Sequence, residues 1–363
     1  MAHQREELFQ FVRRALRLKR SDALTSIPLA KRGSSRSFHR IRYDHHGSVV
    51  LMCYDRVREE NNYYAAIADF LSKIHIPVPR VLAHDPLKGF IVMEDLGDRD
   101  LWSYRDEPWV RRSSYYRATL SIVHRLHTFP IEGFPFDKVA LMRGFSLDLY
   151  RWERNYFMEN FVHAVCDINL KPRDAKDLEE ELKRLSVRLE DAGHSLVHRD
   201  LQSQNVMISK GQPVLIDFQG MRVGNLFYDL GSLLYDPYVL LPEEERVELL
   251  FYYYHLPAGH SEDSVRDATS SVYKIIKVSQ GKADMRHTNW TEFQDRFWDA
   301  SAQRLMQALG AYGFLGLKGG LSEFLAHIPS GIVNLVDVST RANRLPLLKN
   351  LALKCQQSLY GKS

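Results

Sequence analysis

The chain has 363 residues, of which 45% are hydrophobic and 26% are charged, so it can bury a large core and we expect two lobes or domains. Its 49 basic and 45 acidic residues leave a net charge of only +4, which argues against nucleic acid or a membrane surface as a partner. No apolar stretch approaches the roughly 18 residues that a membrane span needs.

The start of the chain predicts a protein that is not exported, because Glu6 and Glu7 interrupt any apolar signal segment. Apolar residues in the same stretch recur at helical spacing and predict a surface helix: Leu8, Phe9, Phe11, Val12, Ala15 and Leu16. The cysteines lack C-x-x-C spacing, which favours free thiols in a reducing cytoplasm over a zinc site or disulfides: Cys53, Cys166 and Cys355. No obligate protein partner is expected.

Strand patterns dominate the next part of the chain. Residues 37–43 and 48–54 read as strands joined by a polar turn, which predicts a hairpin. Residues 57–75 have a helical pattern, and a further strand is expected at 89–94. Long helical patterns follow. We therefore predict an α+β fold with a small N-terminal sheet lobe, residues 1–95, and a larger, mainly helical C-terminal lobe, residues 96–363.

The strongest chemical signal is the sequence HRDLQSQN, which places Asn205 five residues after Asp200. A second aspartate, Asp217, ends the apolar run at 214–216. This spacing suits phosphoryl transfer from ATP, in which Asp200 would orient the acceptor hydroxyl and take its proton, while Asn205 and Asp217 would hold Mg²⁺ against the phosphates. A chance tripeptide or a helix cap explains each piece alone. The three pieces in this order favour a kinase.

Neighbouring residues are expected to support this loop without reacting. His198 and Arg199 precede the catalytic aspartate, and Asp229 follows on the next predicted helix. Each is expected to act through Asp200.

The order of these motifs resembles the protein-kinase-like fold, and the whole chain resembles its small-molecule branch, which includes aminoglycoside phosphotransferases and choline kinases. Segments 33–40, 90–98 and 303–310 are similar to segments of bacterial kinases that phosphorylate the anomeric hydroxyl of N-acetylmuramate or N-acetylglucosamine. The resemblance implies a cytoplasmic sugar kinase of cell-wall recycling that uses ATP and Mg²⁺.

The nucleotide phosphates are expected to meet the loop Gly33-Ser34-Ser35, where small residues let backbone N–H groups approach an anion. A surface turn has the same composition. The following strand lacks the lysine that kinases use there, so another cation must neutralise the phosphates. We choose Arg40, which lies in the segment that resembles the sugar kinases, and leave three alternatives open: Arg36, Arg42 and Arg56.

By analogy with kinases, the backbone from Met93 through Glu94 to Leu96 would bind adenine, although an ordinary central strand has the same pattern. The acceptor would be recognised by the helical lobe, where Trp290 is a candidate to stack on a sugar ring and Arg304 to bind hydroxyls or a carboxylate. Core or surface roles for both residues remain open.

Three rival functions remain. An aminoglycoside or other small-alcohol phosphotransferase would share the catalytic residues, although the mixed charges of residues 280–320 disfavour a polycation. A nucleotide-binding pseudokinase is suggested by the missing lysine, but the complete set of Asp200, Asn205 and Asp217 argues against it. A protein kinase is least favoured, because the chain lacks an A-P-E segment and a recognisable activation loop.

Overall fold

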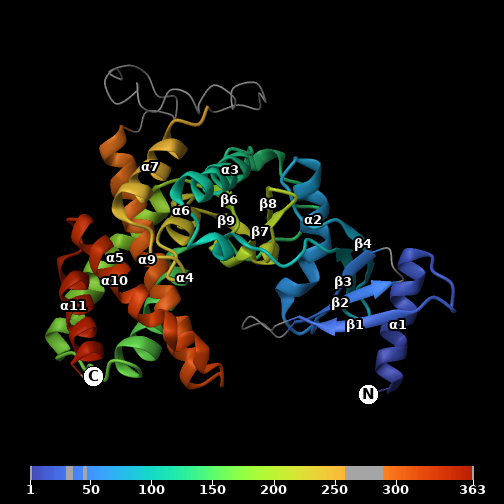
Figure 1. The fold of residues 1–363 in the computed structure, drawn as a ribbon. Coiled ribbons are helices and arrows are strands. Elements are labelled where there is room, and N and C mark those ends of the chain that lie inside the picture. Colours follow the sequence, from blue (N-terminus) through green and yellow to red (C-terminus); the bar gives the residue numbers. More distant parts are fainter. Residues whose placement is uncertain (1, 30–35, 44–46, 258–288, 362–363) are drawn as a thin grey trace.

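The computed structural model describes residues 2–29, 36–43, 47–257 and 289–361, and these form two lobes (Figure 1). In the described part of the N-terminal lobe an antiparallel sheet has the strand order β1-β2-β3-β5-β4. Its strands are β1 (Leu24–Pro28), β2 (Ser37–Tyr43), β3 (Gly47–Cys53), β4 (Val81–Asp85) and β5 (Phe90–Glu94). The predicted α+β fold, with a sheet lobe followed by a helical lobe, is confirmed. The predicted phosphate loop, Gly33 to Ser35, lies outside the described residues.

Helices cover both faces of this sheet. Side chains alternate along β3, so Val49 and Leu51 face α1 (Ala2–Leu16), which buries Phe11 and Val12 against them. On the other face, Met52 shares a core with Ile67 of α2 (Tyr64–Lys73). The predicted N-terminal helix is therefore a layer of the N-lobe core.

The predicted hairpin is present as β2 and β3, with Phe38 opposite Met52. The predicted helix 57–75 is shorter and begins as the 3₁₀ helix η2 (Glu59–Tyr63) before α2. Strands β1 and β4 were not predicted. Both lie at sheet edges, β1 ends in a proline and β4 contains a register shift, so neither has the apolar alternation of a central strand.

The C-terminal lobe combines helices with two small antiparallel pairs. Strand β6 (Ser195–Val197) pairs with β9 (Arg222–Gly224), and β7 (Val206–Ser209) pairs with β8 (Gln212–Leu215). Short helices η6 (Ser203–Asn205) and η7 (Phe218–Gly220) lie between them in the chain. The remaining helices are η3 (Leu101–Tyr104), α3 (Trp109–His127), η4 (Ile131–Gly133), α4 (Leu147–Phe157), the π-helix η5 (Met158–His163), α5 (Pro172–Asp191), α6 (Phe227–Leu234), α7 (Glu243–Tyr254), α9 (Trp290–Leu317), η9 (Ser322–His327), α10 (Ile328–Arg341) and α11 (Pro346–Tyr360).

The 28-residue helix α9 is the centre of this lobe, where it packs against α4, α6 and α10 (Figure 1). Glycines permit two of its close contacts. A Cβ atom at Gly231 of α6 would lie 2.7 Å from the Ser301 hydroxyl, and one at Gly313 of α9 would lie 2.1 Å from the Asn160 carbonyl oxygen. The approach of α6 to α9 brings Arg304, which follows Ser301, close to residues 198–205, which we call the catalytic segment.

One apolar core extends through both lobes, from Met52 and Met93 of the sheet to Leu305 of α9. The last sheet strand, β5, ends at Glu94. Because the apolar core continues past Glu94 from one lobe into the other, the packing does not mark a boundary there. The division into residues 1–95 and 96–363 stays a prediction. Among the helices that the structure describes, none is long and apolar enough to cross a membrane.

Candidate active site

A cleft of about 710 Å³ lies between the lobes and receives side chains from both. This volume is in the range of small-molecule sites. Asp200, Asn205 and Asp217 line it together with Arg304. The structure thus gathers into one cavity the three residues that the spacing singled out, and adds a basic residue about a hundred positions further along the chain.

The backbone before Asp200 is held by Asp229, whose side chain is fully buried in the first turn of α6. Its carboxylate accepts the amide N–H of His198 at 2.7 Å and that of Arg199 at 2.8 Å, and contacts His127 Nε2 at 3.0 Å. Arg199 has a φ of 79°, which is costly for a residue with a Cβ atom. These hydrogen bonds hold the strained backbone of Arg199 and so fix the position of the Asp200 backbone that follows it.

The backbone after Asp200 is held by a second buried carboxylate, Asp236. It accepts the Ser203 amide at 2.7 Å and the Ser203 hydroxyl at 2.6 Å, while its other oxygen accepts the Tyr238 amide at 3.0 Å. Burial raises the pKa of Asp236 to about 6, even though these donors favour the charged form. The catalytic segment is therefore fixed at both ends by carboxylates of the helical lobe.

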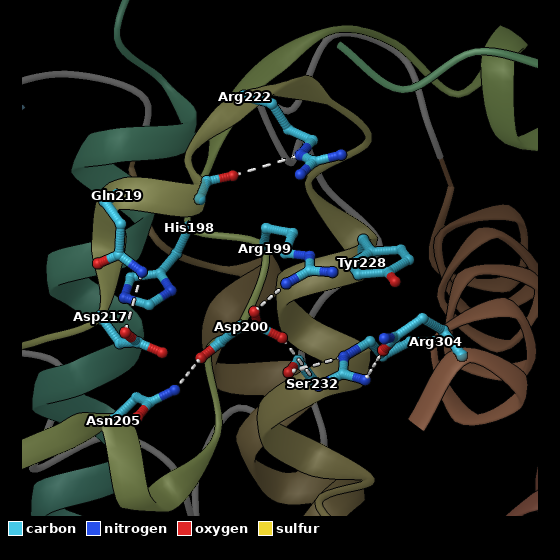
Figure 2. Close-up of polar contacts among 12 residues, drawn as sticks. His198, Arg199, Asp200, Asn205, Asp217, Gln219, Arg222, Tyr228, Ser232 and Arg304 are labelled. Carbon is cyan, nitrogen blue, oxygen red and sulfur yellow. Dashed lines mark hydrogen bonds and ion pairs between the residues drawn. The ribbon is translucent and has the colours of Figure 1, made fainter. Parts of the chain in front are cut away.

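Asp200 itself is surrounded by cations (Figure 2). Arg199 donates to Oδ2, and Arg304 Nη2 lies 3.3 Å from Oδ1. Burial would raise the pKa of Asp200, but the charges of Arg199, Arg304 and His198 outweigh it and lower the pKa to about 2. Asp200 is consequently a carboxylate at neutral pH.

Asn205 and Asp217 offer oxygen atoms to the same cavity. The Asn205 amide nitrogen donates to the Asp200 carbonyl at 2.9 Å, which leaves its side-chain oxygen for a ligand. Asp217 has a left-handed φ of 64° and accepts Gln219 Nε2 at 3.0 Å (Figure 2). Mg²⁺ prefers one or two such oxygen ligands together with substrate phosphates, so this donor set suits it.

His198 links the two chain segments that carry these residues. Its Nε2 donates to the Ile216 carbonyl at 2.9 Å, one residue before Asp217. The ring therefore ties the segment that carries Asp200 to the segment that carries Asp217. Its supporting role in catalysis stays a prediction.

The contacts of the arginines favour a different residue as the replacement for the kinase lysine. Arg40 donates from Nε to Asp95 Oδ2 at 2.6 Å and from Nη1 to Asp98 Oδ1 at 2.7 Å. These two carboxylates raise the pKa of Arg40. Arg36 is only 6% exposed and forms an ion pair with Asp217. Both arginines line the cleft, Arg40 where it holds the segment after β5 and Arg36 beside Asp217, so our choice of Arg40 stays a prediction and Arg36 becomes its strongest alternative.

An apolar slot lines the cleft between the lobes. It is lined from the sheet side by Leu29, Val50, Met93 and Leu96, and from the C-terminal lobe by Met207 of β7 and by Ile216, which follows β8. Of the three residues expected at the adenine hinge, Met93 and Leu96 contribute to this slot, and Glu94 also lines the cavity. The Glu94 amide donates to the Arg80 carbonyl at 2.9 Å, so that amide is occupied by the sheet edge.

One face of α9 forms the helical side of the cleft. The residues recur at helical spacing after Arg304: Gln307, Ala308, Ala311, Tyr312 and Leu315. The sequence analysis named none of these as site residues, although Gln307 and Ala308 lie in the segment 303–310 that resembles the sugar kinases. Counting three and four residues onward from Arg304 would have found them all. Other segments also contribute to the lining, with Tyr238 from the stretch after α6 and Glu323, Phe324 and His327 from η9.

Trp290 does not line the cleft. It packs against Phe251, Tyr254 and Phe293 in an aromatic cluster near the start of α9. Fourteen residues separate it from Arg304, roughly 20 Å along a helix. Its position does not agree with the predicted contact to the acceptor, and its aromatic neighbours account for it as a packing residue.

Comparison with known proteins agrees with this geometry. The profile of the APH family, described as a phosphotransferase enzyme family, matches residues 26–263. An N-acetylmuramate/N-acetylglucosamine kinase of Pseudomonas putida is 27% identical over 348 residues, 93% of this chain and 92% of that protein. An enzyme of the same name from Neisseria meningitidis is 24% identical over 283 residues, 77% of this chain and 75% of that protein.

Among solved structures, a choline/ethanolamine kinase family protein from Mesorhizobium loti superimposes with a TM-score of 0.58 at 13% identity. The superposition covers 98% of this chain and 99% of that protein. At this identity the likeness concerns the fold, and it confirms the protein-kinase-like arrangement of a sheet lobe over a helical lobe.

Proposed function

Since the chain belongs to the APH phosphotransferase enzyme family and is a kinase that transfers phosphate to a hydroxyl group, we propose that its acceptor is an amino sugar. The preferred acceptors are N-acetylmuramate and N-acetylglucosamine, phosphorylated at the anomeric hydroxyl by Mg·ATP in the cytoplasm. The observation that carries phosphoryl transfer is the meeting of Asp200, Asn205 and Asp217 in one cleft. The sugar is supported by the full-length relative named for these acceptors.

Asp200 binds the acceptor hydroxyl and aims its oxygen at the γ-phosphate. With a pKa of about 2, its carboxylate is ionised whenever the sugar arrives, and it is a weak base. Its main contribution is therefore orientation, and it receives the hydroxyl proton as the new bond to phosphorus forms. Arg199 and Arg304 hold the carboxylate in place during this step.

Asn205 and Asp217 would hold Mg²⁺, which when bound neutralises charge on the ATP phosphates. Arg36, paired with Asp217, supplies the positive charge that a lysine supplies in other kinases. The apolar slot that includes Val50 and Met93 would receive the adenine ring. The loop Gly33 to Ser35 remains our candidate for phosphate contacts through its backbone.

An acceptor screen tests this proposal. ADP release is measured with Mg·ATP and, in turn, N-acetylmuramate, N-acetylglucosamine, other amino sugars, aminoglycosides and choline. We expect turnover of the N-acetylated sugars. Turnover of choline or of an aminoglycoside alone would replace the proposal with the small-alcohol alternative, and ATP binding without any turnover would favour a pseudokinase.

The position of the phosphate is tested with the methyl glycoside of an accepted sugar. This compound lacks only the free hydroxyl at C1, so it should inhibit without being phosphorylated. Phosphorus NMR of the product from the free sugar should show coupling to the anomeric proton. Coupling to C6 protons would leave the kinase reaction intact and reject the anomeric assignment.

A further inference from the structure

Four aromatic rings from three chain segments line the helical side of the cleft. They are Tyr238 after α6, Tyr312 of α9, and Phe324 and His327 of η9. The ring centroids of Tyr238 and His327 are 4.3 Å apart, and those of Tyr312 lie 6.0 Å from both Tyr238 and Phe324. The rings therefore form one continuous surface, which we call the aromatic wall.

The aromatic wall differs from the packed aromatic clusters of the core. Tyr238, Phe324 and His327 are half-buried and border the cavity, whereas Phe293, in the cluster around Trp290, is 0% exposed. Burial lowers the pKa of His327, so at neutral pH its ring is an uncharged aromatic surface like the other three.

Two residues of the aromatic wall, Tyr238 and Tyr312, contact polar groups near Asp200, and Phe324 and His327 pack on their rings. The Tyr238 amide donates to Asp236, the carboxylate that also accepts the Ser203 amide and hydroxyl. The Tyr312 hydroxyl lies 3.5 Å from the side-chain nitrogen Nε2 of Gln202, two residues after Asp200. Tyr312 also follows Arg304 by two turns of the same helix, and Arg304 contacts Asp200.

The chemistry around the wall suits one class of acceptor. A pyranose ring has an apolar face of C–H groups, which packs well on an aromatic face, and a rim of hydroxyls that require hydrogen bonds. Side-chain amides border the same half of the cleft at Gln202, Gln204 and Gln307. A quaternary ammonium ion would also bind aromatic faces. It lacks the several hydroxyl groups with which a pyranose can form hydrogen bonds to these amides.

Resting on the proposed function, we propose that the aromatic wall is the sugar subsite: the acceptor pyranose lies with its apolar face on Tyr238, Phe324 and His327, which directs one ring hydroxyl to Asp200. The wall then selects a cyclic acceptor over an open-chain alcohol. Its residues determine acceptor affinity and leave nucleotide affinity to the sheet side of the cleft.

Two single substitutions test the subsite: Tyr238→Ala and Phe324→Ala. Each should raise the KM for N-acetylglucosamine by about tenfold, the loss of roughly one stacking contact, with the KM for ATP unchanged within about twofold. Tyr238→Phe, which retains the ring, should recover most of the affinity for N-acetylglucosamine that Tyr238→Ala loses. Trp152→Ala is the matched control, because Trp152 is 53% exposed and stacks on Tyr156 outside the cleft.

A binding measurement complements the kinetics. Saturation-transfer NMR with the wild type should show the strongest transfer to the ring C–H protons of the sugar, and Phe324→Ala should reduce it while circular dichroism reports an unchanged fold. Unchanged sugar KM in both alanine variants, with sugar still phosphorylated, would overturn the aromatic wall and leave the proposed function standing. Turnover of choline and no sugar would instead reject the proposed function.

Discussion

On the helical side of the cleft, the catalytic segment is held by two fully buried carboxylates, Asp229 and Asp236, whereas on the sheet side Arg36 and Arg40 pair with carboxylates at the cleft itself. The helical side uses hydrogen bonds that no ligand can reach. The partner of Arg36, in contrast, is a residue proposed to bind metal. We infer that the helical side is rigid before ligands arrive and that the sheet side exchanges partners as they bind.

The largest effect on kcat is expected from replacing Asp200, the residue of the helical side that we propose contacts the acceptor hydroxyl. Asp200→Asn should lower kcat by roughly 10²- to 10⁴-fold, because the amide cannot take the hydroxyl proton, while ATP affinity is nearly unchanged. Asp217→Ala is the matched variant on the metal-binding segment, and it should abolish Mg²⁺-dependent nucleotide binding together with activity. Steady-state kinetics and calorimetric nucleotide binding measure both. Equal, mild effects would show that these roles are wrongly assigned.

A smaller effect is expected from weakening the hydrogen bonds that Asp229 makes behind the catalytic segment, because Asp229 does not line the cleft. Asp229→Asn replaces an acceptor of two amide N–H groups by a side chain that also donates, so kcat should fall about 10- to 100-fold. The free energy of unfolding should fall by about 2–4 kcal/mol. Chemical denaturation and kinetics check this, with Asp148→Asn as an exposed control. Lower stability with normal kcat would separate Asp229 from catalysis.

On the sheet side the two arginines should differ. Arg36→Ala should raise the KM for ATP about tenfold and lower kcat, because the phosphates lose a buried cation, and Arg36→Lys should recover part of this. Arg40→Ala should change the KM for ATP only about two- to threefold, through the loosened segment at Asp95. Initial-rate kinetics at varied Mg·ATP distinguish them. The reverse ranking would restore Arg40 as the phosphate-binding residue.

The smallest effect concerns pH. Because Arg199 and Arg304 lower the pKa of Asp200 to about 2, wild-type kcat/KM should show no loss from Asp200 protonation between pH 7 and about pH 5. Arg304→Gln removes one cation, so the pKa of Asp200 rises and the acidic limb of the profile moves to higher pH. The same lowered pKa makes a contribution to stability that is present above the ordinary pKa of an aspartate and is lost as the pH falls toward 2.

Profiles of kcat/KM from pH 4 to pH 8 measure this shift. Arg188→Gln is a control, since Arg188 pairs with Asp299 away from the cleft. An Arg304→Gln profile that shows no more loss at its acidic end than the wild-type profile would show that Arg304 does not act on Asp200.

The parts of the site that local spacing determines could be predicted. Asp200, Asn205 and Asp217 lie within eighteen residues of one another. The β7–β8 hairpin returns the chain to its starting point, so the residues before β7 and after β8 lie close together. The hairpin of β2 and β3 is local in the same sense. Edge strands β1 and β4 lack a strong pattern of their own and depend on their neighbours.

What depends on distant contacts could not be predicted. Arg36 and Arg40 are four residues apart, and only the fold shows that one meets Asp217 and the other Asp95. Trp290 and Tyr312 are both aromatic residues of α9, yet helix packing turns one toward a core cluster and the other toward the cleft. The phosphate loop from Gly33 to Ser35 stays a prediction.

Helix α9 also indicates how a site of this design can diversify. Arg304, Gln307, Tyr312 and Leu315 occupy one stripe of a single uninterrupted helix. An α-helix turns about 100° per residue, so inserting or deleting one residue between Arg304 and Tyr312 would rotate the later positions out of the cleft. New acceptor specificities are therefore accessible through substitutions along this stripe, while the number of residues between Arg304 and Tyr312 is constrained. Mutant libraries that aim to change the acceptor should vary the residues of this stripe.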